Sequence, residues 1–253
     1  MGMIPWVFSD ALAIPESLFS DRQPLQPKPS IPSSTITQVS PGAGLAHEKS
    51  RRRELETNSL IEELNLLWEP IRPYLARQVE ELYGRRDGHI LEVGPFSGLI
   101  FELARRGIGQ SFSIAAFPHT AIPLYRPAAQ KHGLKDRVRI IESDSSLSNV
   151  GEGSVDLAIF RGALFFPSLF QVDFSAVDRR LNAKGVAVVG GGFGKYTPAE
   201  VIDQIGKRSE KLNAAMGRVR ITVESVRDQL RASALEASCE ITTEGGLWVV
   251  LRK

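Results

Sequence analysis

The chain has 253 residues, of which 42% are hydrophobic and 24% are charged, and these proportions exclude a fibrous or wholly disordered protein. Its 31 Lys and Arg against 29 Asp and Glu give a net charge of +2, which is too small to predict binding to nucleic acid or to an anionic membrane. The single cysteine, Cys239, excludes an internal disulfide, and no run reaches the ~18 apolar residues of a membrane span, so we expect a cytoplasmic protein.

Residues 1–46 are predicted to form a proline-rich, disordered arm. Seven of the 15 prolines of the chain lie in this segment, and runs such as Gln23–Pro29 neither form a helix nor bury much surface. Six apolar residues interrupt this pattern: Trp6, Phe8, Leu12, Ile14, Leu18 and Phe19. Two interpretations are open for them, a short segment that docks on the domain or on a partner, and a tail with a few apolar side chains, which we favour.

Residues 47–87 are predicted to form a helical cover. Between Leu60 and Leu82, apolar residues recur at steps of one, three and four, which is the pattern of a helix with one buried face. Pro70 and Pro73 interrupt this run, so we expect two successive helices.

In residues 88–253, predicted strands alternate with predicted helices, which is typical of a parallel sheet with helices on both faces. The predicted strands are His89–Val93, Ser111–Ala115, Val138–Glu142, Val155–Phe160, Val186–Val189, Ala237–Thr243 and Leu247–Leu251. The last two are joined by a tight turn, so they run antiparallel to each other. We therefore expect an α/β sandwich with a seven-stranded, mostly parallel sheet that contains one antiparallel strand.

The strongest local signal for a ligand lies in the segment Ile90–Gly98, which reads Ile-Leu-Glu-Val-Gly-Pro-Phe-Ser-Gly. A buried strand ends in Glu92 and passes into a glycine turn (residues 94–98) that opens a helix. Glycines let the backbone approach a ligand closely, and the free N–H groups of a helix N-terminus can bind it. We expect a nucleoside-type ligand at this carboxyl end of the sheet.

This segment resembles the first motif of the class I S-adenosylmethionine-dependent methyltransferases, an acidic residue followed by Gly-x-Gly-x-Gly. The resemblance extends over residues 88–253, because Asp144, the fourth-strand segment Gly153–Leu164 and the turn Leu181–Val186 match later family motifs in order and spacing. It implies a Rossmann-like methyltransferase domain that binds S-adenosylmethionine and transfers its methyl group to a small molecule. In-line displacement of a sulfonium methyl group can rely on proximity and orientation, so no catalytic residue is predicted.

The resemblance also implies where the cofactor lies. Gly94, Pro95 and Gly98 would line its methionine part, Glu92 would help to position its amino group, and Asp144 would meet the adenine. Arg161 ends the fourth strand, and we favour a contact with the ligand carboxylate over a role as a strand end only. The predicted cofactor-binding residues are Glu92, Gly94, Pro95, Phe96, Ser97, Gly98, Ala116, Phe117, Asp144, Ser145 and Arg161.

Two positions depart from the family pattern. Phe96 replaces the middle glycine of the motif, and its ring either turns away from the cofactor or narrows its site. Ala116 stands where the family usually has an acidic residue that holds the ribose hydroxyls, which removes two hydrogen bonds worth about 1.5–3 kcal/mol each. His119 is the nearest candidate to compensate, although we favour a histidine on a helix surface. The alternative function is therefore a non-catalytic binding or scaffolding subunit with a degenerate cofactor site.

A glycine cluster, Gly190–Gly194, follows the fifth predicted strand. It either holds an anion or shapes a substrate pocket, or it is a flexible turn, and both interpretations stay open. The candidate substrate-binding residues beside it are Phe193, Lys195 and Tyr196. Three further aromatic residues, Phe165, Phe166 and Phe170, are expected in the core, with an apolar substrate wall as the alternative.

Other chemistries lack the residues that they need. The four histidines show no metal-ligand spacing, so no metal is predicted. The segment Phe160–Ala163 replaces the Asn/Asp-Pro-Pro-Tyr/Phe motif of enzymes that methylate nucleic acid bases, which favours a small-molecule acceptor. A nicotinamide-dependent oxidoreductase ranks last, because Gly-x-Gly-x-x-Gly and an acidic residue after the second strand are both missing. The oligomeric state is not predicted.

Overall fold

The computed structural model describes residues 41–253, with side chains from residue 48 onward. Helix α1 (Pro41–Leu67) begins inside the segment that was predicted as an arm, and a proline is well tolerated in the first turn of a helix. The rest of that arm, with its six apolar residues, lies outside the described residues. Within the described part of the chain, no helix is both long and apolar enough to cross a membrane.

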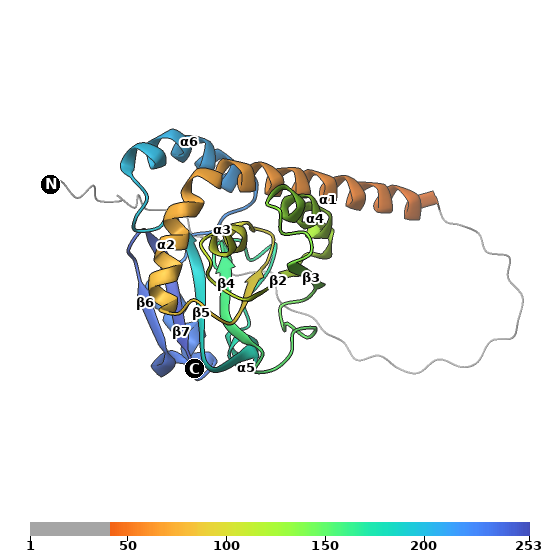
Figure 1. Ribbon diagram of the computed structural model, residues 1–253. Coiled ribbons are helices and arrows are strands. Elements are labelled where there is room, and N and C mark those ends of the chain that lie inside the picture. The colour runs from red at the N-terminus through yellow and green to blue at the C-terminus, as the bar shows by residue number, and fades with distance from the viewer. Residues whose placement is uncertain (1–40) are drawn as a thin grey trace, which may run out of the picture. The chain divides into compact units, whose positions relative to one another are not determined.

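A seven-stranded sheet with the order β3-β2-β1-β4-β5-β7-β6 forms the centre of the domain (Figure 1). The strands are β1 (His89–Val93), β2 (Ser111–Ala116), β3 (Val138–Glu142), β4 (Val155–Arg161), β5 (Leu181–Gly192), β6 (Cys239–Thr242) and β7 (Gly246–Arg252). Strands β1 to β5 pair in parallel, and β7 runs antiparallel to both of its neighbours. The predicted α/β sandwich with one opposing strand is therefore confirmed.

The helices cover the sheet and its carboxyl end. They are η1 (Glu69–Ile71), α2 (Arg72–Tyr83), α3 (Leu99–Arg105), η2 (His119–Ala121), α4 (Ile122–Lys131), α5 (Phe174–Arg180), α6 (Ala199–Ala215), α7 (Val223–Ala232) and η3 (Glu236–Ser238). The predicted break near Pro70 and Pro73 is confirmed, because η1 separates α1 from α2. The sequence pattern predicts a helix over about Ser168–Leu181, whereas α5 starts at Phe174, because Asp173 caps it by accepting a hydrogen bond from the backbone N–H of Ala176 (2.9 Å).

Strand β5 is longer than predicted, and it contains the first three glycines of the cluster, Gly190–Gly192. Gly190 and Gly192 pair with β7 as part of the ladder. A Cβ atom at Gly190 would lie 2.1 Å from the carbonyl oxygen of Leu247, and one at Gly192 would lie 2.2 Å from that of Gly245. These two glycines are thus part of a strand and not of a flexible turn, and they let two backbones approach each other closely.

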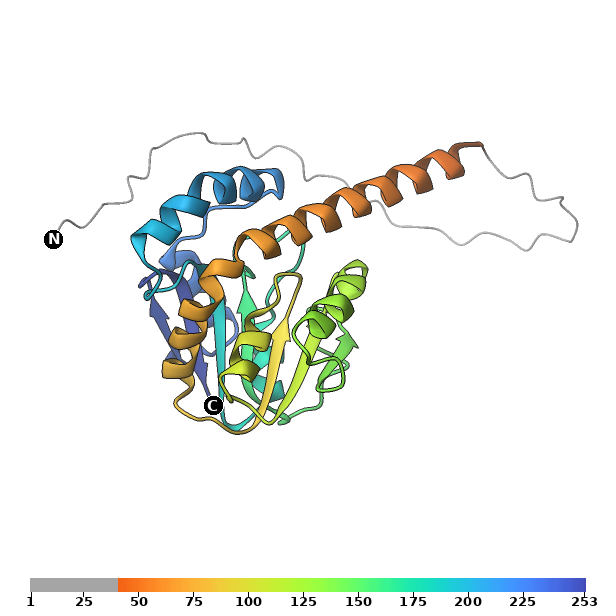
Figure 2. The same cartoon turned by 45° about the horizontal axis from the view of Figure 1, so that its top comes forward.

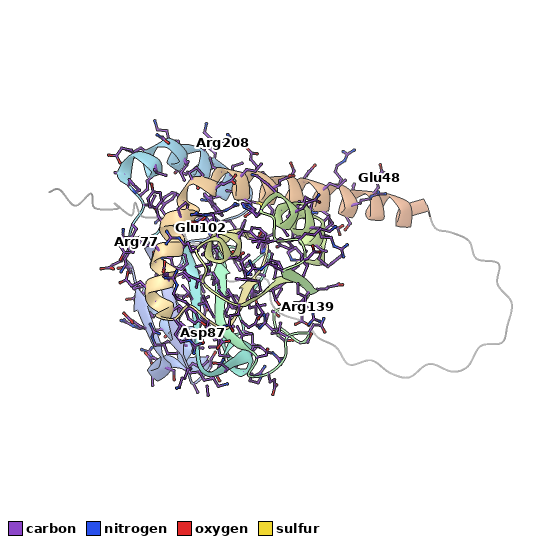
Figure 3. All side chains as sticks on the ribbon, viewed as in Figure 1. Glu48, Arg77, Asp87, Glu102, Arg139 and Arg208 are labelled. Atoms are coloured by element: carbon purple, nitrogen blue, oxygen red, sulfur yellow. The ribbon has the colours of Figure 1, made fainter. Side chains whose placement is uncertain are left out.

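Helix α1 lies over the end of the sheet toward which β1 and β4 point, and α2 runs from there along the sheet, beside α3 (Figure 2). Asn65 donates a hydrogen bond to the carbonyl oxygen of Pro95 (3.0 Å), and the indole N–H of Trp68 donates to the hydroxyl of Ser209 in α6 (2.9 Å). Arg208 of α6, labelled in Figure 3, forms an ion pair with Glu63 of α1 (2.6 Å). These contacts hold α1 against both the glycine turn and α6.

Candidate active site

Glu92, the acidic residue of the first motif, holds the first turn of α3. Its side chain is fully buried, and its carboxylate accepts hydrogen bonds from the backbone N–H groups of Gly98 (2.9 Å), Leu99 (3.1 Å) and Ile100 (3.3 Å). Burial raises the pKa of Glu92, although these three hydrogen bonds act in the opposite direction. The structure thus uses both carboxylate oxygens to shape the glycine turn.

Two glycines of this turn are covered by side chains from other parts of the chain. A Cβ atom at Gly94 (φ +94°) would lie 2.8 Å from the ring of Phe170, and one at Gly98 (φ +114°) would lie 2.5 Å from the guanidinium of Arg72. In both cases the covering atoms are the ends of side chains, whereas backbone atoms cover Gly190. Rotation of the Phe170 and Arg72 side chains would therefore open the space over the turn.

A pocket of about 470 Å³ lies at the carboxyl ends of β2 and β3. Its lining includes three of the predicted cofactor-binding residues, Phe117, Asp144 and Ser145, together with His119, the candidate for compensation. The other lining residues are Pro118, Glu142, Ser143, Pro167, Leu169, Phe170 and Gln171. Small-molecule pockets commonly have ~300–1,000 Å³, so this one has room for a nucleoside.

Asp144 organises its own loop at the rim of this pocket. One carboxylate oxygen accepts from the backbone N–H (3.0 Å) and the hydroxyl (2.7 Å) of Ser146, and the other accepts from the hydroxyl of Ser148 (2.9 Å). These hydrogen bonds lower the pKa of Asp144, with the hydroxyl of Ser146 as the largest contribution. The residue therefore stays ionised at neutral pH and fixes the loop that carries Ser145.

Glu142 is a pocket residue that the sequence analysis missed. It is the last residue of β3, it lines the pocket, and it stands in register with Ala116 on β2. Neighbouring residues of a parallel pair project to the same face of the sheet, so Glu142 places a carboxylate beside the position that lacks one. The sequence signal was an acidic residue at the end of the third predicted strand, but its meaning depends on the register between two strands.

Phe96 turns away from this pocket. Its ring is fully buried, and it packs against Trp68 (centroids 5.3 Å apart) and Phe166 (4.9 Å). It is not among the residues that line the pocket. Phe166 is thus a core residue as expected, whereas Phe170 forms part of the pocket wall and lies over Gly94.

Arg161, at the end of β4, is a buried cation without a partner. Its side chain is 3% exposed, its guanidinium lies over the ring of Trp68 (4.4 Å to the centroid), and its Nη1 atom is buried without a hydrogen-bond partner. Among the described residues it forms no hydrogen bond and no ion pair. Burial lowers the pKa of Arg161 to about 9, and the positive charge of Arg72 contributes in the same direction.

The predicted substrate-binding residues lie apart from this pocket. Lys195 forms an ion pair with Glu81 of α2 (2.8 Å), and the hydroxyl of Tyr196 donates to the other oxygen of that carboxylate. Arg77 of α2, labelled in Figure 3, lies over the ring of Tyr196 (4.0 Å). Phe193 is half-buried and packs against the core. Lys195 and Tyr196 thus link α2 to the connection between β5 and α6.

No group of three or more His, Cys, Asp or Glu side chains gathers as a metal site within residues 48–253.

The glycine turn is also held by hydrogen bonds to two of its backbone carbonyl groups. The carbonyl oxygen of the buried Ser97 accepts a hydrogen bond from Arg72 (3.4 Å). The hydroxyl of Tyr125, on α4, donates to the carbonyl oxygen of Gly94. The glycine turn is therefore held by the cover from one side and by α4 from the other.

Comparison with known proteins gives matches of structure only. No family model and no curated protein matches the sequence. A candidate S-adenosyl-L-methionine-dependent methyltransferase from Methanococcus maripaludis matches with a TM-score of 0.63 and 22% identity, over 79% of this chain and 93% of that chain. A candidate O-methyltransferase from Nostoc punctiforme matches with a TM-score of 0.55 and 12% identity, over 76% of this chain and 60% of that chain. The S-adenosylmethionine-dependent methyltransferase SibL matches with a TM-score of 0.52 and 16% identity, over 72% of this chain and 54% of that chain. The chain therefore has the fold of the class I S-adenosylmethionine-dependent methyltransferases.

Proposed function

We propose that this protein transfers a methyl group from S-adenosylmethionine to a small-molecule acceptor. The observation that carries the proposal is the pairing of an openable glycine turn with the pocket of about 470 Å³ beside it, at the carboxyl end of the sheet. In open α/β sheets, ligands bind at this end, near the point where the strand order reverses. Here that point lies between β1 and β4.

The residues present fit the cofactor. At the pocket, Phe117 offers an apolar surface for the adenine, and Glu142 and His119 offer polar groups for the ribose hydroxyls. At the turn, Gly94 and Gly98 leave space that only the ends of two side chains occupy, which suits the methionine part.

When bound, S-adenosylmethionine would supply a sulfonium methyl group for in-line displacement by the acceptor atom, with S-adenosylhomocysteine as the leaving group and any acceptor proton passing to solvent when the site opens. The protein's part is to orient the two reactants and to exclude water. Phe96 and Phe166 are buried and pack with Trp68 of the cover, so the turn lies next to apolar rings that would limit the access of water. Orientation in such a site supplies much of the rate enhancement without an acid or base.

Isothermal titration with S-adenosylmethionine tests the proposal. We expect one binding site per chain. A protein that binds no S-adenosylmethionine at millimolar concentration would instead be the non-catalytic binding or scaffolding subunit. The observation that favours this second function is the cover over the turn, since Phe170 and Arg72 already fill the space above Gly94 and Gly98.

Replacing Glu142 with glutamine is expected to raise the Kd for S-adenosylmethionine about tenfold. The variant loses a charge-assisted hydrogen bond, worth about 1.5–3 kcal/mol, at the position where Ala116 offers none. The carboxylate of Glu142 makes no hydrogen bond with a described residue, so the melting temperature should stay unchanged. Glu240→Gln on β6 is the matched control. Equal affinities for Glu142→Gln and the control would show that Glu142 does not hold the ribose.

A further inference from the structure

The buried charges beneath the cover do not balance. Arg72, Arg161 and Glu92 lie close enough for their charges to act on one another. Two guanidinium groups and one carboxylate leave one excess positive charge among these side chains, because the further carboxylate beside Arg72, that of Glu69 (3.8 Å), is 39% exposed and is screened by water. An unpaired buried charge is costly, so it persists where function requires it.

Arg161 is the group that is left over. The carboxylate of Glu92 is engaged by three backbone N–H groups of α3. Arg72 donates to the carbonyl oxygens of Asn65 (2.7 Å) and Ser97 (3.4 Å), and it faces the carboxylate of Glu69 (3.8 Å). Of these three side chains, only that of Arg161 has no hydrogen-bond or ion-pair partner within residues 48–253, and its guanidinium lies over the ring of Trp68. A guanidinium pairs best with a carboxylate or phosphate, in a two-pronged geometry.

The cofactor as a whole carries no net negative charge that could balance this excess. S-adenosylmethionine carries a sulfonium, an ammonium and a carboxylate group, so it adds a further net positive charge. With the cofactor in place the excess beneath the cover grows from one to two. An acceptor with an anionic group reduces it, and the aromatic rings of Trp68, Phe96 and Phe166 are the apolar surfaces near that anion.

We infer that the methyl acceptor is an organic acid with an apolar body, and that Arg161 binds its carboxylate beneath the cover. The identification of this acid as the acceptor rests on the proposed function, whereas the acid site itself does not. Entry to the site uses the same movement of Arg72 and Phe170 that opens the glycine turn. Recognition by charge at Arg161 would exclude neutral and cationic analogues of the same size.

Thermal melts with simple acids and their amides test the acid site without cofactor. Acetate, benzoate and phenylacetate at millimolar concentration are compared with acetamide, benzamide and phenylacetamide. We expect at least one acid, and none of the amides, to raise the Tm of the wild-type protein by mass action. In Arg161→Gln the effect of the acid should fall at least tenfold, as judged from the concentration needed for the same shift. Arg137→Gln, which removes a guanidinium over Phe112 (5.4 Å), should respond like the wild type.

The ligand-free protein gives an independent readout. A buried guanidinium without an anionic partner lowers the stability of the ligand-free protein. Arg161→Met removes this charge and should therefore raise the Tm by about 2 °C or more. A structural role would produce the opposite, a loss of Tm in Arg161→Met. If that loss occurs, or if no acid stabilises the wild type more than Arg161→Gln, the proposal is overturned.

Titration with two cofactors separates an acceptor acid from the carboxylate of the cofactor. If the acceptor supplies the anion, Arg161→Gln binds S-adenosylmethionine and its decarboxylated analogue as the wild type does. If Arg161→Gln weakens binding of S-adenosylmethionine tenfold and leaves the decarboxylated analogue unaffected, Arg161 binds the cofactor and the inference is wrong. A protein that binds acids at Arg161 and no S-adenosylmethionine would retain the acid site and refute the proposed methyl transfer alone.

Discussion

Replacing Glu92 with alanine is expected to lower the free energy of unfolding by about 3–5 kcal/mol, because it removes one member of a buried network of charges and hydrogen bonds. Three N–H groups at the start of α3 would lose their acceptor together, and none of them is exposed to water. The same change removes the carboxylate that partly offsets the charges of Arg72 and Arg161. Urea denaturation followed by circular dichroism measures the loss.

Two further variants test whether the hydrogen bonds and the charge of Glu92 cause this loss of stability. Glu92→Gln keeps one carbonyl oxygen as an acceptor and is expected to lose less, about 1–3 kcal/mol. Glu210→Ala, on the exposed side of α6, should stay within about 0.5 kcal/mol of the wild type. Equal denaturation midpoints for Glu92→Ala and Glu210→Ala would mean that Glu92 does not hold the turn.

The second large effect is expected at Gly190. Replacing it with alanine should destabilise the protein by about 2–5 kcal/mol, from ~1–2 kcal/mol of backbone strain at positive φ and ~1–3 kcal/mol of overpacking. The added methyl group would lie 2.1 Å from the carbonyl oxygen of Leu247 and 2.9 Å from the Cα of Trp248, and φ at this glycine is +152°. Backbone atoms cannot rotate aside, so β7 would have to shift from β5.

Gly206→Ala is the matched control for this prediction. Gly206 lies within α6, and nothing lies within 4 Å of the position of its Cβ. The alanine there should stabilise the protein by about 0.5–1 kcal/mol, since glycine is unfavourable inside a helix. A Gly190→Ala protein with the stability of the wild type would contradict the close approach of β5 and β7.

Local patterns predicted the fold well where one face or both faces of an element are buried. The ranges predicted for β1 and β3 match the structure, because short segments rich in Ile, Leu and Val between polar turns are typical of buried strands. The end of β5 was not predictable, since consecutive glycines are typical of a turn and only contact with β7 makes them a strand. The start of α5 failed because Leu169 and Phe170 continue an apolar pattern while packing at the pocket instead.

The site was predictable only as far as it follows from one strand and one turn. The motif located Glu92 and the glycine turn, which β1 and α3 position by themselves. Glu142 was missed because its place beside Ala116 depends on strand register. The position of Arg161 at the end of a strand was predicted, but its lack of a hydrogen-bond partner among the described residues depends on how the rest of the chain packs around it.

The side chains over the glycine turn occupy the space that a ligand at the turn would need. If the ligand binds over the turn, as we propose, only molecules in which Phe170 and Arg72 have moved off Gly94 and Gly98 can bind it, so the measured Kd equals the intrinsic Kd divided by the open fraction. Asn65, whose carbonyl oxygen holds Arg72 in place, contributes to that fraction. Affinity and association rate can therefore evolve through residues that never touch the bound ligand.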